Sequence, residues 1–130
     1  MNDTITLILQ TPEHKVEISD LWQIILPGQE GEMGILPNHA PMLVELKTDL
    51  ITTIPSRPRF FVVGGIAYIT RHACHVKTVH FEDTQHIDIS KLEAEIDSLS
   101  QEMLQANAFY KHALLDQLTA KNILMKKKIL

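Results

Sequence analysis

Half of this chain lacks the two residues that most often interrupt regular structure. All five glycines and all six prolines lie at or before Gly65, and residues 66–130 contain neither. Glycine and proline mark the turns between short strands, whereas their absence permits long helices. The sequence therefore predicts a first half built from strands and a second half built from helices.

Other absences narrow the class of protein. Cys74 is the only cysteine, which excludes an internal disulfide and is typical of a reducing compartment. No apolar run reaches the roughly 18 residues of a membrane-spanning helix, and the first residues lack the basic segment of a secretory signal. The net charge of −4 disfavours nucleic acid as a partner, because phosphate binding needs clustered lysine and arginine. We therefore expect a soluble cytoplasmic protein.

The first half contains short apolar or alternating segments, each closed by a turn residue. They recur at a spacing of roughly 8–12 residues, which is typical of a β-sandwich or flattened barrel. The segments are residues 4–10, 15–18, 22–26, 50–54, 59–63, 66–70 and 75–79.

The second half has the apolar spacing of a helix. Steps of three and four residues place one stripe on one helix face, at Leu92, Ile96, Leu99, Met103, Ala106, Tyr110 and Ala113. Asp88 and Ser90 are the candidate N-cap residues. Residues 88–105 carry five acids against one lysine, and residues 106–130 carry five lysines against one acid. This distribution suits one straight helix or an antiparallel hairpin that turns near residues 105–107.

Three glycines and three prolines crowd into residues 27–46. Glycine adopts positive φ without a steric clash, and proline fixes φ, so this stretch specifies a detailed backbone path. It contains no nucleophile paired with a base. We expect a shaped binding surface here and no catalytic residue.

This stretch carries a resemblance to a known family. Gly31-Glu32-Met33-Gly34, Leu36-Pro37 and His39-Ala40-Pro41 resemble the Gly-Glu-x-Gly-x-x-Pro-x-His-Ala-Pro motif of the epsilon subunits of F-type ATP synthases. Residues 61–65 are similar to the family's Phe-Val-x-Gly-Gly segment, and residues 87–88 open a terminal helical region as in the family. The chain departs from the family at Tyr68, where glutamate is frequent.

The resemblance implies an α+β protein with two domains. Residues 1–87 would form a β-sandwich that binds the gamma subunit and the polar loops of the c-subunit ring. Residues 88–130 would form an antiparallel two-helix hairpin that extends toward the alpha/beta hexamer and obstructs ATP hydrolysis. The chain would be a non-catalytic coupling subunit of the central stalk, at the cytoplasmic face of the inner membrane, attached only through the complex. No nucleic acid and no obligate homo-oligomer is expected.

The resemblance also implies the contact residues. Those expected to meet the c ring and the gamma subunit are Glu30, Gly31, Glu32, Met33, His39 and Pro41. His39 is expected to hydrogen-bond the loop backbone instead of acting as a base. The regulatory helix end is the basic run Lys126, Lys127 and Lys128, which would approach acidic surface on the beta subunits.

Some family members bind ATP through an Ile/Leu-Asp-x-x-Arg-Ala motif in the hairpin. The corresponding residues here are Ile87, Asp88, Lys91 and Leu92. Lysine lacks the bidentate fork of arginine, and leucine is larger than alanine. The three candidate contacts, Ile87, Asp88 and Lys91, therefore make a weak nucleotide motif. We expect no required cofactor.

Two alternatives stay open. The chain could be a β-domain with a helical arm that serves as a scaffold in another complex. It could also be a small metal-binding or ligand-binding enzyme, because His72, Cys74, His75, His80 and His86 are crowded and zinc uses such ligands. Their spacing lacks the paired pattern of zinc sites, so scattered surface histidines and a buried Cys74 are the favoured prediction, with no metal.

Overall fold

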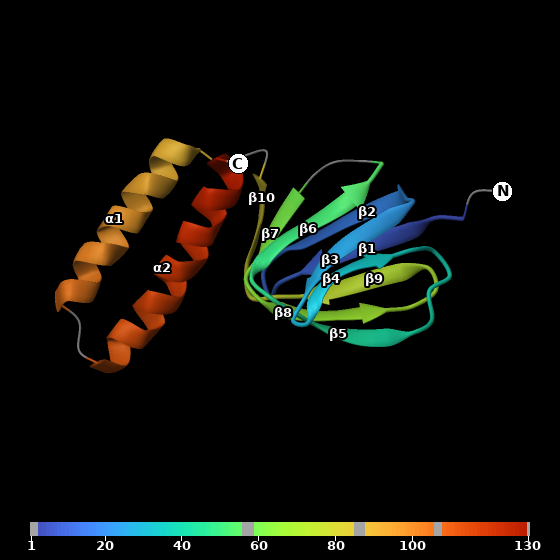
Figure 1. Cartoon of the computed structure of the whole chain (residues 1–130), viewed down its shortest axis with the longest axis horizontal. Helices are drawn as coiled ribbons and strands as arrows, with labels where there is room; N and C mark the ends of the chain where they lie inside the picture. Colours follow the sequence, from blue (N-terminus) through green and yellow to red (C-terminus); the bar gives the residue numbers. More distant parts are fainter. Residues whose placement is uncertain (1–2, 56–58, 85–87, 106–107, 130) are drawn as a thin grey trace. The chain divides into compact units, whose positions relative to one another are not determined.

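The computed structural model describes residues 3–55, 59–84, 88–105 and 108–129 (Figure 1). It divides into two compact units, Met1–Gln85 and His86–Leu130. The first unit is built from strands and the second from helices. The predicted α+β class is confirmed. The predicted domain boundary, between residues 87 and 88, falls next to residues 85–87, which lie outside the described ranges.

The described residues of the first unit form ten strands. They are β1 (Ile5–Gln10), β2 (Lys15–Leu21), β3 (Gln23–Gly28), β4 (Gly31–Ile35), β5 (Met42–Leu46), β6 (Asp49–Ile54), β7 (Arg59–Val62), β8 (Gly65–Ile69), β9 (Ala73–Lys77) and β10 (Phe81–Asp83).

The strands form one curled sheet in the order β10-β7-β6-β3-β5-β8-β9-β1-β2, with β4 paired to β3 outside this path. Among the described strands, β1 and β9 run parallel, and the other neighbouring pairs run antiparallel. Figure 1 shows the sheet folding over on itself, so that its inner face encloses the core as in a β-sandwich.

Alternation along each strand sends every second side chain inward. In β1, Ile5, Leu7 and Leu9 are fully buried, whereas Ile8 between them is half-buried. Each buried aliphatic side chain of this kind contributes about 1.5–3 kcal/mol of transfer free energy. The core comprises Ile5, Leu7, Leu9, Leu21, Ile24, Leu26, Ile35, Val44, Leu46, Ile51, Phe60, Val62, Ala67, Ile69, Cys74 and Val76.

β4, β5 and β10 were not predicted from the sequence. Two glycines in β4 lower its intrinsic strand preference, and the strand forms because it pairs along its length with β3. β10 has only three residues, and its Phe81 ring packs edge-on against the Phe60 ring, with centroids 6.3 Å apart. Tertiary contacts, rather than local preference, form β4 and β10.

The second unit contains α1 (Ile89–Gln105) and α2 (Ala108–Ile129). They lie side by side as an antiparallel hairpin (Figure 1). Leu92 on α1 and Ala120 and Leu124 on α2 are buried. The predicted turn region, 105–107, coincides with the break between the two helices, although residues 106–107 are outside the described part. In the described ranges no helix has the length and apolarity needed to cross a membrane.

Asp88 caps α1. Its Oδ1 accepts hydrogen bonds from the backbone N–H groups of Ser90 at 2.9 Å and Lys91 at 3.4 Å. A side-chain oxygen in this position satisfies amides that have no partner within the helix. The structure therefore selects Asp88 from the two predicted capping residues.

Candidate functional site

The matched Gly31–Pro41 motif begins in a tight hairpin. Gly28 pairs with Gly31 across β3 and β4, which leaves Gln29 and Glu30 as a two-residue turn. Gly31 has φ of 138°, a conformation that side chains disfavour. A Cβ on Gly28 would lie 2.7 Å from the carbonyl oxygen of Gly31. The two glycines therefore permit a turn that other residues would distort.

Gln29 anchors this turn to β5. Its backbone N–H donates to the carbonyl of Glu45 at 2.9 Å, and its Nε2 donates to the carbonyl of Leu46 at 3.2 Å. In the other direction, the N–H of Lys47 donates a hydrogen bond to the carbonyl of Pro27 at 2.8 Å. These bonds fix the tip against the sheet, so the exposed side chains beside Gln29 project from a defined backbone.

An acidic hollow of about 440 Å³ lies between the turn and β5, lined by residues 28–33 and 42–45. Three carboxylates border it, from Glu30, Glu32 and Glu45, and all three side chains belong to exposed residues. Met33 is half-buried and packs against the core. The structure thus brings the predicted contacts Glu30, Gly31, Glu32 and Met33 together.

Glu45 was not predicted as part of this site. It lies on β5, which the sequence analysis missed, and alternates with the buried Val44 and Leu46. The alternation Val44-Glu45-Leu46 was visible in the sequence and was the signal that could have placed Glu45 on an exposed face.

The corner that follows β4 holds His39. Asn38 has a left-handed φ of 67° and is fixed by two bonds, from its N–H to the carbonyl of Arg71 at 2.8 Å and from its Nδ2 to Asp3 Oδ2 at 2.8 Å. His39 Nδ1 lies 2.7 Å from the carbonyl oxygen of Ala40, so this nitrogen carries the proton. The predicted bond between His39 and the loop backbone is present, and Pro41 beside it is exposed.

A second surface, which we call the outer apolar face, covers β5, β8 and the segment that follows β9. Its members point away from the core, with exposed fractions of 69% for Leu43, 55% for Ile66, 48% for Tyr68 and 75% for Val79. They border a broad hollow of about 930 Å³. Contiguous exposed apolar groups of this kind mark interaction sites on folded proteins.

Strand register brings this face together. Leu43 lies opposite Tyr68, Tyr68 lies opposite His75, and the Tyr68 and His75 rings are 6.4 Å apart between centroids. The sequence analysis missed this face because it predicted strands without their pairing. The sequence signal that could have revealed this face was Ile66, an apolar residue at an outward position of β8 next to the buried Ala67.

The crowded histidines do not share a site with Cys74. Cys74 is buried in the core, where desolvation raises the pKa of its thiol to about 12, whereas His75 lies on the opposite face of β9. The predicted buried Cys74 is confirmed. Across the described residues, no group of three histidine, cysteine or acidic side chains is placed to hold a metal ion. His86 lies outside the described ranges.

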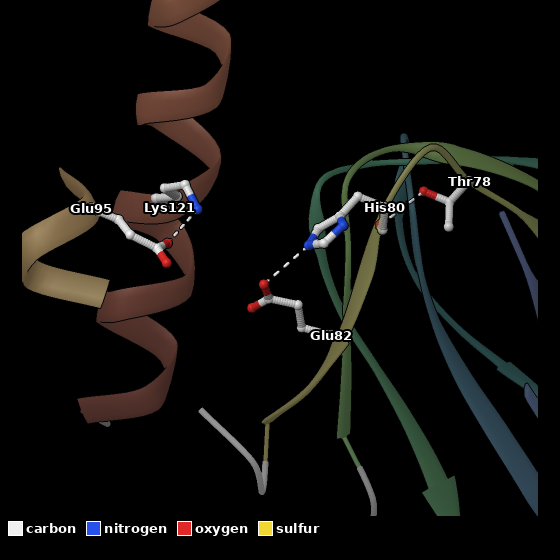
Figure 2. A network of polar contacts seen from close by, with 5 residues as sticks. All are labelled: Thr78, His80, Glu82, Glu95 and Lys121. Atoms are coloured by element: carbon white, nitrogen blue, oxygen red, sulfur yellow. Dashed lines mark hydrogen bonds and ion pairs between the residues drawn. The ribbon is translucent and has the colours of Figure 1, made fainter. Parts of the chain in front are cut away.

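His80 belongs to a separate polar network (Figure 2). Its Nε2 lies 3.0 Å from Glu82 Oε1, and its carbonyl accepts the Thr78 hydroxyl at 3.3 Å. The same hydroxyl lies 3.1 Å from the carbonyl of Val63. These contacts hold the backbone segment that leads into β10, so we assign His80 a structural role.

The remaining predicted residues lie in the helical unit. Asp88 caps α1, Lys91 is exposed, and Ile87 is outside the described part. Lys126 is exposed near the end of α2, and the side chains of Lys127 and Lys128 are not among those described.

Comparisons with known proteins bear on this geometry. Residues 4–84 match the model of the ATP synthase delta/epsilon chain beta-sandwich domain. The ATP synthase epsilon chain 2 of Nitrobacter hamburgensis is 30% identical over 97 residues, covering 73% of this chain and 71% of the relative. The ATP synthase epsilon chain of Rhodospirillum centenum is 31% identical over 117 residues, covering 83% and 80%.

The fold is also similar to that of chains in solved assemblies. One comes from the mitochondrial ATP synthase of Euglena gracilis, in a structure of OSCP, F1 and the c-ring, with a TM-score of 0.75, 18% identity and coverage of 95% of this chain and 81% of that chain. Another comes from the central stalk and c-ring of the Tetrahymena thermophila enzyme, with a TM-score of 0.65, 14% identity and coverage of 95% and 96%. From the family model and the curated relatives together, this chain belongs to the epsilon-chain family of F-type ATP synthases.

Proposed function

We propose that this chain is the central-stalk epsilon subunit of a bacterial-type ATP synthase. It couples proton-driven rotation to ATP synthesis and contributes no catalytic residue. The observation that carries this proposal is the anchored hairpin tip of the matched motif, where Gln29 binds β5 and the carboxylates of Glu30 and Glu32 are exposed. A rigid tip with exposed charge suits a coupling contact, because torque passes through it without loss to backbone motion.

The acidic hollow is the proposed contact with the c ring. The resemblance implies that Glu32 faces the polar loops of the ring, and the structure places Glu30 and Glu45 at the border of the same hollow. Three carboxylates in one place favour a polar or cationic partner surface. We therefore add Glu45 to the residues that meet the ring.

The outer apolar face is the proposed contact with the gamma subunit. The chain path supports this, because His39 and Pro41 lead directly into β5, whose Leu43 belongs to the face. Leu43, Ile66, Tyr68 and Val79 would each lose apolar surface to water on docking, which stabilises a complex by about 25 cal/mol per Å² before the costs of association. His39 would shape the rim of this contact.

The helical hairpin is the proposed brake on ATP hydrolysis. In the hairpin, α1 and α2 contact each other, Leu92, Ala120 and Leu124 are buried, and the Glu95 carboxylate pairs with Lys121. Extension toward the alpha/beta hexamer would break these contacts, and new contacts must replace them. The basic end, from Lys126 to Lys128, would meet acidic surface on the beta subunits.

Asp88 is proposed to be a structural cap and not a nucleotide ligand. Its Oδ1 is already engaged by two backbone amides of α1. We propose no required cofactor. The β-sandwich, residues 1–87, would carry assembly, and residues 88–130 would carry regulation. The chain would lie at the cytoplasmic face of the membrane through its partners.

The test is binding of the full chain to the cognate αβγ complex, followed by addition of the c ring. The proposal predicts one chain per αβγ complex and recruitment of that complex to the ring. Absence of binding to αβγ would contradict the assignment and favour the scaffold in another complex. Binding to αβγ without recruitment to the ring would contradict the role of the acidic hollow.

A further inference from the structure

Asn38 lies at the corner between β4 and β5, where its backbone is left-handed, with φ of 67°. Asparagine adopts this conformation more readily than most residues, because its short polar side chain often bonds the local backbone. Here the side chain bonds a distant segment, since Nδ2 donates to Asp3 Oδ2 at 2.8 Å. The two residues are 35 positions apart, so this bond ties the segment that precedes β1 to the corner.

The backbone of Asn38 ties the corner to the turn between β8 and β9. Its N–H donates to the carbonyl of Arg71 at 2.8 Å. The next carbonyl in that turn, from His72, accepts the N–H of Thr6 on β1 at 3.0 Å. Asn38 therefore joins three segments that are distant in the sequence, namely the N-terminal segment, the corner itself and the β8–β9 turn.

The corner leads into one of the proposed contacts. His39 follows Asn38 directly, and Pro41 precedes β5, whose Leu43 belongs to the outer apolar face. The His39 ring bonds the carbonyl of the next residue, which holds the shape of the corner. The two bonds of Asn38 hold the corner against the neighbouring segments, and thus set where it lies.

We infer that Asp3 and Asn38 are positioning residues for the contact with the gamma subunit. Their hydrogen bond keeps the corner in the conformation that docks, so that the partner meets a preformed edge. This inference rests on the proposed function, because it is there that the corner is assigned to this contact. It gives the N-terminal segment, which holds none of the predicted contact residues, a part in assembly.

The expected effect is moderate because both residues are exposed. A hydrogen bond from an amide to an ionised carboxylate is stronger than one between neutral groups, although water competes with it at the surface. Without the bond, the corner occupies the docking conformation for a smaller fraction of the time, and the apparent affinity falls in proportion. The loss should appear as slower association, since the free chain must first order the corner.

The experiment measures the association and dissociation rate constants of the full chain with the cognate αβγ complex at pH 7.5. Asn38→Asp retains a residue that accepts left-handed φ but places two carboxylates together. Association should therefore slow about fivefold, the effect of losing one hydrogen bond. Adding Asp3→Asn to this variant exchanges donor and acceptor, because an amide at position 3 can donate to a carboxylate at position 38. The double variant should associate within about twofold of the native rate.

Two further variants separate the bond from other effects. Asp3→Ala removes the acceptor without placing like charges together, and it should slow association about threefold. Ser19→Asp adds the same charge as Asn38→Asp at an exposed position of β2 that borders neither hollow. It is the charge-matched control and should bind like the native chain.

Slower association of Asn38→Asp that the double variant recovers would establish the positioning role. Equal association of Asn38→Asp and the native chain would overturn it, and so would a loss that the double variant does not recover. A loss confined to faster dissociation would also overturn it, because it would indicate direct contact of Asn38 with the partner. An equal loss at Ser19→Asp would overturn it in favour of net charge. No binding of the native chain would overturn the proposed function itself.

Discussion

Glu95 on α1 and Lys121 on α2 form an ion pair, with Lys121 Nζ 2.6 Å from Glu95 Oε2 (Figure 2). The pair joins residues 26 positions apart, so it forms only when the two helices are folded together. The side chains remain 28% exposed for Lys121 and 42% exposed for Glu95. The pair is therefore a modest stabiliser of the hairpin.

We expect the coupling energy between these residues to be about 0.5 kcal/mol, because partly exposed pairs are weakened by solvent. A double-mutant cycle with Glu95→Gln, Lys121→Gln and the double variant measures this coupling energy. Urea unfolding of each variant is monitored through the helical signal. Lys126→Gln is the control at an exposed lysine of the same helix. A coupling energy of zero would show that apolar burial alone holds the hairpin.

The acidic hollow yields a prediction about assembly with the c ring. Glu32→Lys and Glu45→Lys should each weaken recruitment of the assembled αβγ complex to the ring about tenfold, because each places a cation where we propose a polar or cationic partner. Affinity for αβγ alone should stay unchanged. Glu17→Lys on β2, which does not border the hollow, is the charge-matched control. Equal effects of all three changes would mean that net charge, rather than the hollow, determines recruitment.

Substitutions in the outer apolar face should weaken binding to αβγ, whereas those in the acidic hollow should weaken recruitment to the ring. Tyr68→Ala and Ile66→Ala should each weaken binding to αβγ by about 1–3 kcal/mol, since truncation removes apolar contact from the proposed interface. Binding is measured by titration at pH 7.5. Trp22→Ala is the matched control, because Trp22 is 56% exposed and does not border the hollow of this face. A loss at Trp22 as large as that at Tyr68 would contradict the assignment of this face.

Cys74 provides a prediction about reactivity. Burial raises the pKa of its thiol to about 12, so very little thiolate is present near pH 8. Alkylation by iodoacetamide at pH 8 should be at least about 100-fold slower in the folded chain than in urea. The rate in the folded chain should rise with pH up to that pKa. Equal rates in the two states would show that Cys74 is accessible, contrary to its place in the core.

The fold was largely predictable from the sequence because turn residues and apolar spacing are local features. The crowding of glycine and proline into residues 1–65 indicated the strand-rich part, although β8, β9 and β10 extend beyond Gly65. The spacing from Leu92 to Met103 predicted the face of α1 that packs. The motif from Gly31 to Pro41 was specific enough to indicate the family, which the comparisons confirm.

Pairing between distant segments was not predictable in the same way. β4 contains Gly31 and Gly34 and has little strand preference of its own, so its existence depends on β3. The outward-facing row of Leu43, Tyr68 and His75 depends on the register of three strands. Glu45 joins the acidic hollow only because the turn between β3 and β4 is hydrogen-bonded to β5. The missed site residues are therefore those whose neighbours lie far away in the sequence.

The most direct test of the central claim is ATP hydrolysis by the cognate αβγ complex, measured with the full chain or with residues 1–87 after circular dichroism has shown that the fragment folds. We expect that both forms bind αβγ and that only the full chain slows hydrolysis. Binding of both forms with no inhibition would contradict the braking role of the hairpin. Binding of neither form would contradict the assignment to the central stalk.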